Sequence, residues 1–422
     1  MSKIVADLHI HSRFARACSK ALNLKTIDAA CRVKGVQLVS TGDCTHPLWM
    51  EEIERDLEEE GNGFLRLRGT DGTVKFILGS EVSCIYTFKG KVRRVHLCLY
   101  FSSIADAKKF NKALVDRGRN IHSDGRPIIG LSSQEVLRIM LEINPASMMI
   151  PAHVWTPWFA VFGSKSGFDS LEECFDDLTP EIFAIETGLS SDPPMNWRLS
   201  ALDNITLVSN SDAHSLPNLA REANVFAGDI AEFSYTELRR ILKEKDHAKF
   251  LYTIEFYPEE GMYHFDGHRA CGVRMSPQET KKRKGVCPKC KKQLTIGVVY
   301  RVDAIADRPE GFKPPHAIPY KSLVELDKII AESFGVKSRA NPRVQAEHAK
   351  IIAACGNELQ VLIDTPYMEL APTTTSQVVE GIRRVREREL FVEPGFDGQY
   401  GTVKIFSDSK RHTSSQESLF ED

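Results

Sequence analysis

Short apolar runs alternate with amphipathic stretches from residue 3 to about residue 257. Two of the intervening stretches, 24–35 and 133–144, have the spacing of helices. This alternation predicts an α/β fold with a parallel sheet, and the number of repeats favours a closed barrel. Hairpin-like spacing within 74–101 predicts that the barrel is irregular. The apolar runs are KIVADLHI (3–10), GVQLVSTGD (35–43), VKFILGSEV (74–82), RRVHLCLYF (93–101), SMMIPAHVW (147–155), IFAIETG (182–188), ITLVSNSDAH (205–214) and KFLYTIEFY (249–257).

The rest of the chain has a different character. Residues 258–312 form a Cys/His-containing segment with a run of charges, and 313–406 return to helical patterns such as 322–335 and 341–356. The polar tail, 407–422, is expected to be disordered. We therefore predict a barrel domain over 1–257, a small metal-binding module over 258–312, a mainly helical region over 313–406 and a free tail.

Composition narrows the classes of protein that fit. The chain has 422 residues, of which 42% are hydrophobic and 27% charged, and its formal net charge is −2. Contact with a polyanion must therefore come from a local basic patch. The sequence has no long apolar run and no signal-peptide core, so we expect no membrane partner and a cytoplasmic, nucleoid-associated location. Seven of the ten cysteines, Cys98 among them, are scattered singly and are expected to be inert thiols.

Many of the predicted strands end in a side chain that can bind metal. Within a strand, residues i and i+2 face the same way, so His9 and His11 point to one spot. In a (β/α) barrel the strand ends meet at one face, where such a set of imidazoles and carboxylates needs cations between its members. Zinc, manganese or iron suits these donors, and magnesium or manganese is a further possibility for catalysis. The candidates are His9, His11, Asp43, Glu81, His96, His153, Asp212 and His214, with Glu186 as a supporting residue.

The motifs DLHIHS, GDCTHP, GSE, VHL, PAH and SDAH, in this order, resemble those of the polymerase-and-histidinol-phosphatase (PHP) superfamily. The resemblance implies a distorted seven-stranded (β/α)7-type barrel with a multinuclear metal centre, a kind of site that suits phosphoester hydrolysis. The second motif departs from the family's usual Thr-Asp-His, because Gly42 and Asp43 follow Thr41. We take Asp43 as the ligand there and His46 as the alternative.

The loops after the strands supply further candidates. Asp192 follows the strand that ends at Glu186, and it is predicted to be catalytic together with Asp212 and His214. The alternative for Asp192 is a helix N-cap before two prolines. An aromatic run, Trp155, Trp158, Phe159 and Phe162, follows His153. One interpretation is that Trp155 and Trp158 stack on a nucleic-acid base. The alternative is that all four side chains pack the top of the barrel.

The Cys/His segment has the spacing of a structural zinc site. His268-x-x-Cys271 and Cys287-x-x-Cys290 form two knuckle-like pairs fifteen residues apart, as in a zinc ribbon. His264 is the alternative to His268. A basic run beside the second pair, Lys281, Lys282, Arg283 and Lys284, is either a solvated loop or a contact for a phosphate backbone.

A PHP-like barrel followed by a zinc module and helices resembles the endonuclease Q family, with GDCTHP, TPWFAVFG, ETGLSSD and SNSDAHS as matching motifs. The resemblance implies a repair nuclease that nicks DNA on the 5′ side of uracil, hypoxanthine, xanthine or an abasic site. Reading such a base requires that it be flipped out of the duplex, and Asn196 is one conceivable reader. The alternatives are a phosphatase for a small phosphomonoester, or a non-catalytic DNA-binding scaffold.

The tail contains a short motif of its own. Gln416, Leu419 and Phe420 in QESLF resemble the segment by which repair proteins dock on the DNA sliding clamp. The alternative is an ordinary frayed end.

Overall fold

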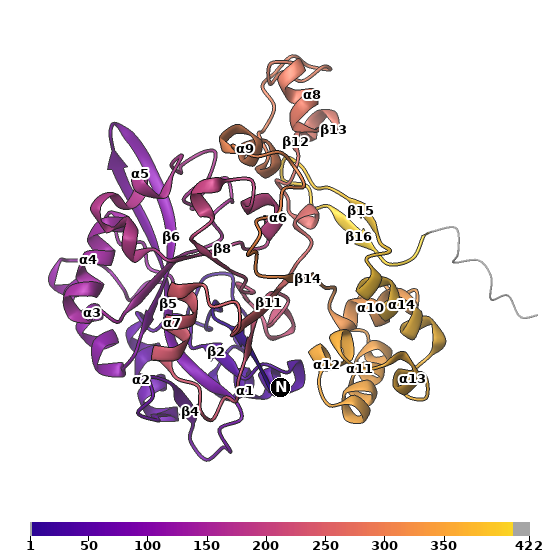
Figure 1. Cartoon of the computed structure of the whole chain (residues 1–422), viewed down its shortest axis with the longest axis horizontal. Helices are drawn as coiled ribbons and strands as arrows, with labels where there is room; N and C mark the ends of the chain where they lie inside the picture. The colour runs from indigo at the N-terminus through magenta and orange to yellow at the C-terminus, as the bar shows by residue number, and fades with distance from the viewer. Residues whose placement is uncertain (1, 408–422) are drawn as a thin grey trace, which may run out of the picture.

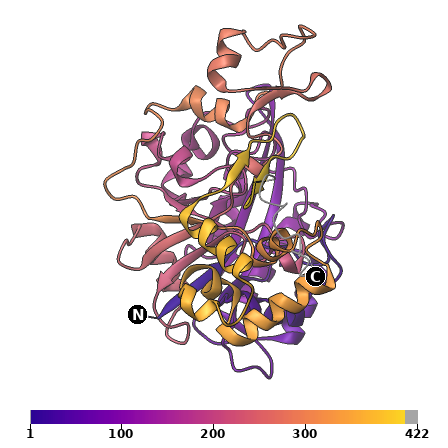
Figure 2. The ribbon, with the colours of Figure 1, turned by 90° about the vertical axis from the view of Figure 1, so that its right-hand side faces the viewer.

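The structure, a computed structural model, describes residues 2–407. It is a mixed α/β fold in three parts: a large body of strands and helices, a small lobe above it and a bundle of helices beside it (Figure 1). Seen from the side, the bundle lies against the lower half of the body, and a hairpin rises from it toward the lobe (Figure 2).

A ten-stranded mixed sheet forms the centre of the large body. β1, β2 and β5 pair in parallel, whereas β5, β6 and β7 pair antiparallel, as do β1, β10 and β11. β14 extends the sheet at one edge, and β4 and β3 extend it at the other. The strands are β1 (Lys3–Asp7), β2 (Leu38–Ser40), β3 (Leu57–Glu59), β4 (Leu65–Leu67), β5 (Lys75–Phe88), β6 (Lys91–Phe101), β7 (Met148–Pro151), β10 (Ala223–Ala227), β11 (Phe250–Glu255) and β14 (Tyr320–Ser322).

The sheet is mixed rather than parallel, which corrects the prediction from the alternating pattern. Lys89 and Gly90 both have positive φ, 48° and 74°, and this two-residue turn folds β6 back antiparallel on β5. β10 was not predicted as a strand, yet all five of its residues are buried between β1 and β11. Its five residues are too few to show a strand period, so its place depends on its neighbours.

A separate parallel pair, β8 (Ala184–Glu186) and β9 (Thr206–Val208), lies beside β7. The Val154 N–H donates to the Glu186 carbonyl at 3.1 Å, which ties the chain after β7 to the end of β8. On the other side, the His11 N–H donates to the Ala213 carbonyl at 3.1 Å. The chain segments that follow β1, β7, β8 and β9 are thus brought together at one end of the strands.

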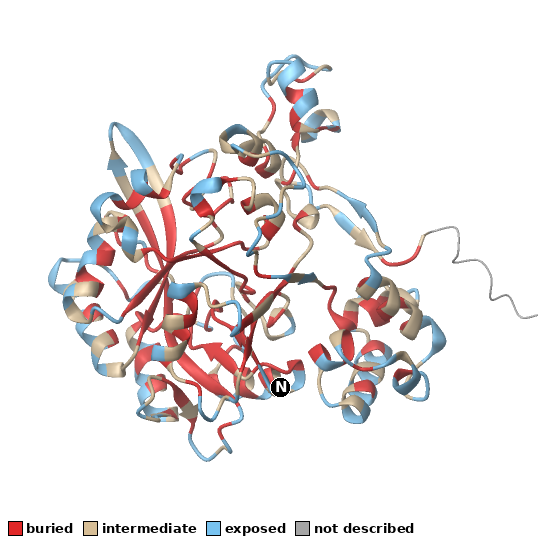
Figure 3. Cartoon of the chain, in the orientation of Figure 1, coloured by how far each residue is buried: buried red, intermediate tan, exposed pale blue. Residues whose placement is uncertain are grey.

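Helices cover the strands, and the apolar side chains between the two layers are buried (Figure 3). α1 and α4 match the helices predicted from spacing, and each begins with a capping box, at Asn23 and Ser132. The helices of the body are α1 (Leu24–Lys34), α2 (Pro47–Asp56), α3 (Ile104–Asp116), α4 (Ser133–Ile143), α5 (Leu171–Phe175), α6 (Pro193–Asn196) and α7 (Tyr235–Glu244), with 3-10 turns η1 (Asp176–Glu181), η2 (Ser200–Leu202) and η3 (Leu216–Asn218).

The small lobe holds the Cys/His segment. Its own apolar cluster consists only of Val273, Met275, Cys287 and Leu294, with Cys271 packed against it. Its elements are η4 (Pro258–Glu260), β12 (Asp266–His268), η5 (Arg269–Cys271), β13 (Val273–Met275), α8 (Pro277–Lys282) and α9 (Val298–Ile305). Such a small apolar core contributes little to the stability of the lobe, so other interactions must stabilise it.

The helix bundle is fastened to the body by a buried ion pair. Lys34 Nζ of α1 lies 2.9 Å from Glu358, and His348 lies 3.0 Å from the same carboxylate. The bundle contains α10 (Leu326–Ser333), α11 (Pro342–Cys355), α12 (Glu358–Ile363), α13 (Tyr367–Leu370) and α14 (Ser376–Glu387), followed by the hairpin β15 (Phe391–Glu393) and β16 (Thr402–Lys404). Across residues 2–407, no helix combines the length and apolar character that a membrane crossing needs.

Candidate metal centre

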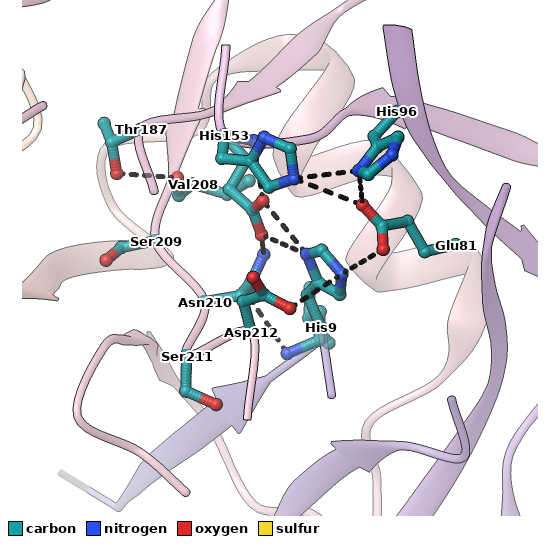
Figure 4. A network of polar contacts seen from close by, with 12 residues as sticks. His9, Glu81, His96, His153, Thr187, Val208, Ser209, Asn210, Ser211 and Asp212 are labelled. Atoms are coloured by element: carbon teal, nitrogen blue, oxygen red, sulfur yellow. Dashed lines mark hydrogen bonds and ion pairs between the residues drawn. The ribbon is translucent and has the colours of Figure 1, made fainter. Parts of the chain in front are cut away.

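A first cluster of metal donors forms just after β1. His11 Nε2 lies 3.2 Å from a carboxylate oxygen of Glu81 and 3.2 Å from one of Asp212. His9 Nε2 lies 3.7 Å from the same two oxygens (Figure 4). The donor atoms of all four residues lie within 4.8 Å of one another. Residues from three places in the sequence therefore converge on one point, as the HxH spacing predicted.

A second cluster shares Glu81 with the first. His96 Nδ1 lies 2.6 Å and His153 Nε2 3.2 Å from Glu81 Oε1, the oxygen that faces away from His11 (Figure 4). Glu81 is fully buried on β5, between the two histidine sets. A carboxylate that belongs to two donor clusters can bridge two cations.

The donor atoms fit a metal better than they fit one another. His9 Nε2, His11 Nε2 and Asp212 Oδ1 are buried and have no hydrogen-bond partner among residues 2–407. Polar atoms left in this state cost free energy unless a ligand satisfies them. Imidazole nitrogens mixed with carboxylate oxygens are the donors that zinc and manganese accept.

The protonation states of His96 and Glu81 suit metal binding. Burial lowers the pKa of His96 to about 4, so its imidazole is neutral at pH 7, the form that binds metal. Burial alone would raise the pKa of Glu81, but His96 and the guanidinium of Arg126 outweigh it and hold that pKa well below its usual value. The shared carboxylate is therefore ionised.

Two further carboxylates orient His9 and His11 by contacting their Nδ1 atoms. Glu186 Oε2 lies 3.0 Å from His9 Nδ1, and Asp43 Oδ1 lies 2.9 Å from His11 Nδ1. Each contact fixes which ring nitrogen carries the proton and turns Nε2 toward the donors. Glu186 thus has the supporting position expected of it.

Asp43 needs a correction, because we expected it to be a ligand. Its second oxygen, Oδ2, accepts from both the N–H and the Oγ of Ser12, each at 2.6 Å, so both of its oxygens are occupied. Asp43 lies outside every donor cluster found among residues 2–407. Its alternative, His46, also lies outside them and contacts the His122 carbonyl at 3.1 Å.

Backbone conformations that are rare for residues with side chains occur at this site. Asp43, His153 and Asp212 have φ values of 48°, 30° and 46°. Gly188 passes so close to His153 that a Cβ there would lie 2.4 Å from the His153 Cβ. The buried carboxylate of Asp7 accepts from the Ser211 N–H at 3.1 Å and so holds the loop of Asp212 in place. The surrounding structure therefore enforces the loop conformations that position the donors.

His214 and Asp192 occupy different places. His214 Nδ1 lies 2.8 Å from the Asp212 carbonyl, at the edge of the first cluster. Asp192 caps α6 by accepting from the Met195 N–H at 3.0 Å, which is the alternative considered for it, and it faces a separate cavity with His264. Burial raises the pKa of Asp192 to about 6. The expectation that Asp192 acts beside the metal donors is not met by this geometry.

The two tryptophans of the aromatic run also separate. Trp155 is fully buried, and its Nε1 donates to Asn196 Oδ1 at 2.8 Å, so neither residue is free to contact a base. Trp158 instead lines a cavity of about 590 Å³ beside the metal donors and packs edge-to-face on Tyr263. Phe159 lies against His96, and Phe162 packs on Trp155 in the core. The DNA-stacking role expected of Trp155 is therefore wrong for this fold.

The cavity next to Trp158 opens directly onto the first cluster. Asp212 and His214 form part of its wall, the lobe contributes Tyr263, and the segment after the bundle contributes Tyr400. Arg221 lies in the same wall, as do Lys328 and Arg339, which pair there with Glu260 and Glu325. All three parts of the molecule thus meet at this cavity.

In the lobe, the four residues of the expected zinc site come together. Donor atoms of His268, Cys271, Cys287 and Cys290 lie within 4.8 Å of one another, and Cys290 Sγ lies 3.4 Å from His268 Nδ1. This is a four-donor set of the kind that binds zinc tetrahedrally. His264, the alternative, is buried away from it.

One of the four residues in the basic run beside this site, Lys281, is engaged in an ion pair within the lobe. Lys281 pairs with Asp303 of α9 and lies over the ring of Tyr300, so it is engaged within the lobe. Lys282, Arg283 and Lys284 are exposed.

Cys98 and Arg126 belong to the site but were not predicted there. Cys98 lies two residues after His96 on β6, on the same face, and its thiol approaches His9 and Glu186. The i, i+2 spacing could have revealed it. Arg126 comes from the loop between α3 and α4, where no periodicity marks it. The predicted clamp-binding residues, Gln416, Leu419 and Phe420, lie outside the described residues.

Comparison with known proteins gives matches over the whole chain. Residues 325–389 match the family model described as the MJ0043 C-terminal domain. The chain is 30% identical over 424 residues to the uncharacterized protein YqxK of Bacillus subtilis, covering 96% of this chain and 100% of that protein. Among solved structures it is similar to the lesion-specific endonuclease PfuEndoQ from Pyrococcus furiosus, with a TM-score of 0.84, 30% identity and coverage of 96% and 95% of the two chains. A structure of endonuclease Q with a 27-mer duplex substrate that has an abasic lesion at the active site matches with a TM-score of 0.83, 30% identity and coverage of 96% and 98%.

Proposed function

The chain belongs to the endonuclease Q family, and from this premise we propose that it is a metal-dependent DNA repair endonuclease. It nicks the phosphodiester bond 5′ of deaminated bases, namely uracil, hypoxanthine and xanthine, or of abasic sites. The observation that carries this proposal is the pair of donor clusters sharing Glu81, with Asp212 of the first cluster in the wall of a cavity large enough for a nucleotide.

We interpret the strands around the donors as a seven-stranded PHP-type barrel made of β1, β2 and β5 to β9. The hydrogen bonds from Val154 to Glu186 and from His11 to Ala213 support closure on both sides of the β8–β9 pair. The clusters hold zinc, or magnesium or manganese, and these ions supply Lewis-acid activation of water and of the phosphoryl group. Asp43 keeps His11 oriented, and Glu186 keeps His9 oriented.

The cavity beside the donors is the proposed site for a nucleotide flipped out of the duplex. Trp158 and Tyr263 offer aromatic surfaces for stacking, and the largely exposed Tyr400 lies at the same wall. Because this wall contains Asp212 of the first cluster, and His214 at the edge of that cluster, a base in the cavity brings its own phosphate against the donors.

The lobe is proposed to be a structural zinc module that contacts the DNA backbone. Its four-donor set supports zinc, and the exposed Lys282, Arg283 and Lys284 support a phosphate contact. Docking on the sliding clamp through the tail and a cytoplasmic location stay predictions.

One assay tests the proposed function against its alternatives. Duplexes with a single deoxyuridine, deoxyinosine or abasic site are incubated with the protein, with and without chelator, beside p-nitrophenyl phosphate. We expect one nick 5′ of the lesion, a 3′-hydroxyl and a 5′-phosphate, no reaction with chelator, and loss of several orders of magnitude in Asp212→Asn.

Two results would overturn the proposal. Hydrolysis of p-nitrophenyl phosphate with every lesion duplex intact would favour a phosphatase. Lesion binding without any cleavage, under each of the three metals, would favour a scaffold.

A further inference from the structure

An arginine from outside the metal-binding motifs reaches the centre of the site. Arg126 Nη1 donates to Glu81 Oε2 at 3.1 Å. Glu81 belongs to both donor clusters, so the guanidinium lies where the two clusters meet. Across residues 2–407, no other lysine or arginine forms an ion pair with a carboxylate of either cluster.

Most of the hydrogen-bonding capacity of this guanidinium is unused. An arginine side chain carries five N–H donors, and among the described residues Glu81 is its one hydrogen-bond acceptor. The side chain is 26% exposed, so it is open on the side away from Glu81.

The loop that carries Arg126 is held firmly on both sides. The Gly125 N–H donates to the Phe14 carbonyl at 3.0 Å, and the Ser83 N–H donates to the Pro127 carbonyl at 2.9 Å. At Gly125 the loop packs so tightly that a Cβ would lie 2.5 Å from Asp43 Oδ2. The backbone that carries Arg126 is therefore fixed relative to Asp43 and β5, and the bond to Glu81 holds the guanidinium at the donor clusters.

On the basis of the proposed nuclease function, we propose that Arg126 is a further catalytic residue, which donates hydrogen bonds to a non-bridging oxygen of the scissile phosphate. Cations at the clusters share the negative charge of Glu81, and the remaining N–H donors of Arg126 then face an anionic substrate. The planar fork of a guanidinium matches two phosphate oxygens, and a donor fixed in advance stabilises the charge of the transition state.

The test compares single-turnover nicking of an abasic duplex by the wild type, Arg126→Ala, Arg126→Lys and Arg117→Ala. Arg117 lies in the same loop, is exposed and donates to the Ala113 carbonyl, so its variant is the matched control. We expect Arg126→Ala to slow nicking by about 10²–10³-fold, while metal content and the Kd for the duplex stay unchanged. Arg126→Lys should recover part of the rate, and millimolar guanidinium should rescue Arg126→Ala but not an equal ionic strength of sodium.

Three outcomes would count against these ideas separately. A wild-type rate in Arg126→Ala overturns the catalytic role. A slow variant that has lost metal and is not rescued by guanidinium also overturns it, because Arg126 would then act only by positioning Glu81. A wild-type protein that leaves every lesion duplex intact overturns the proposed function instead, and the same variants are then compared on bis(p-nitrophenyl) phosphate, where equal rates overturn the role of Arg126.

Discussion

Glu186 Oε2 lies 3.0 Å from His9 Nδ1, and the same carboxylate accepts from the His153 N–H at 2.8 Å. One buried side chain therefore fixes a residue of the first donor cluster and the backbone of a residue of the second. Glu186 also accepts from Asn210, which anchors the chain shortly before Asp212. The geometry of both clusters depends on a residue that is not one of their donors.

Replacing Glu186 by glutamine should weaken metal binding without unfolding the protein. The amide keeps the size of the side chain but loses the charge that orients His9, and such changes typically cost 10–100-fold in metal affinity or activity. Nicking rate measured against metal concentration gives the affinity. Glu172→Gln, at an exposed residue of α5, is the control. An unchanged metal titration in Glu186→Gln would refute this supporting role.

The double variant Cys287→Ala with Cys290→Ala should lose one zinc per chain and lower the Tm of the lobe. The lobe's own apolar cluster has only four buried side chains, so we expect metal binding to supply much of its folding free energy. Metal analysis by mass spectrometry and scanning calorimetry measure the two effects. Cys355→Ala on α11, outside the donor set, should change neither. Full zinc content in the double variant would contradict the proposed site.

Trp155→Ala should affect stability, whereas Trp158→Ala should affect lesion binding, although the two residues are only three apart in the sequence. Trp155 is fully buried, so its loss should lower the free energy of unfolding by about 3–5 kcal/mol in a urea titration. Trp158 lines the cavity, so its loss should leave stability nearly unchanged and weaken lesion binding by about 1–3 kcal/mol, the usual contribution of a stacked base. Equal lesion affinity in Trp158→Ala and wild type would argue against this cavity as the base site.

Reversing the charges of Lys282, Arg283 and Lys284 should weaken binding to every duplex alike. Each lost phosphate contact flattens the slope of log K against log salt concentration by about 0.9. Fluorescence anisotropy at several salt concentrations measures this slope. Reversing the exposed Lys108, Lys109 and Lys112 of α3 is the control for net charge. A slope that changes equally in both triple variants would show that the effect is not local.

Glu358 should stabilise the contact between bundle and body in a pH-dependent way. Burial would raise its pKa, but Lys34 and His348 outweigh burial and lower it to about 2. A folded-state pKa below the unfolded value of 4.5 gives stability that is present above pH 4.5 and is lost as the pH falls toward 2. We expect the difference in unfolding free energy between wild type and Glu358→Gln, measured by urea titration, to shrink over this range. A difference that stays constant from pH 6 to pH 3 would contradict this assignment.

His9, His11 and His153 could be predicted as donors because each follows a strand, and strand ends converge in an α/β fold. Glu81 and His96 were also predicted correctly as members of the donor set, but they lie in the middle of β5 and β6 rather than at strand ends. The role of Asp43 could not be predicted from the sequence. Whether Asp43 binds metal or only orients His11 depends on the hydrogen bonds from Ser12 that occupy its Oδ2. Trp155 and Trp158 lie in a loop without periodicity, so which one is buried depends on long-range packing.

The mixed sheet was missed for a similar reason. β10 is five residues long, and its position between β1 and β11 follows from partners far away in the chain. Arg126 lies in a loop, and only the fold brings it to Glu81. Residues that act through tertiary contacts alone leave no pattern along the chain.

The wall of the nucleotide cavity comes from separate stretches of the chain. Tyr263, Arg339 and Tyr400 all lie beyond residue 257, whereas the donors of the two clusters lie before residue 215. If the cavity receives the nucleotide as proposed, mutations in the later stretches alter which nucleotide is accepted while the donor clusters stay intact. In evolution, substrate preference and bond cleavage can diverge independently in a protein built this way, and a lineage can acquire a new lesion preference by drift and selection in its second half alone.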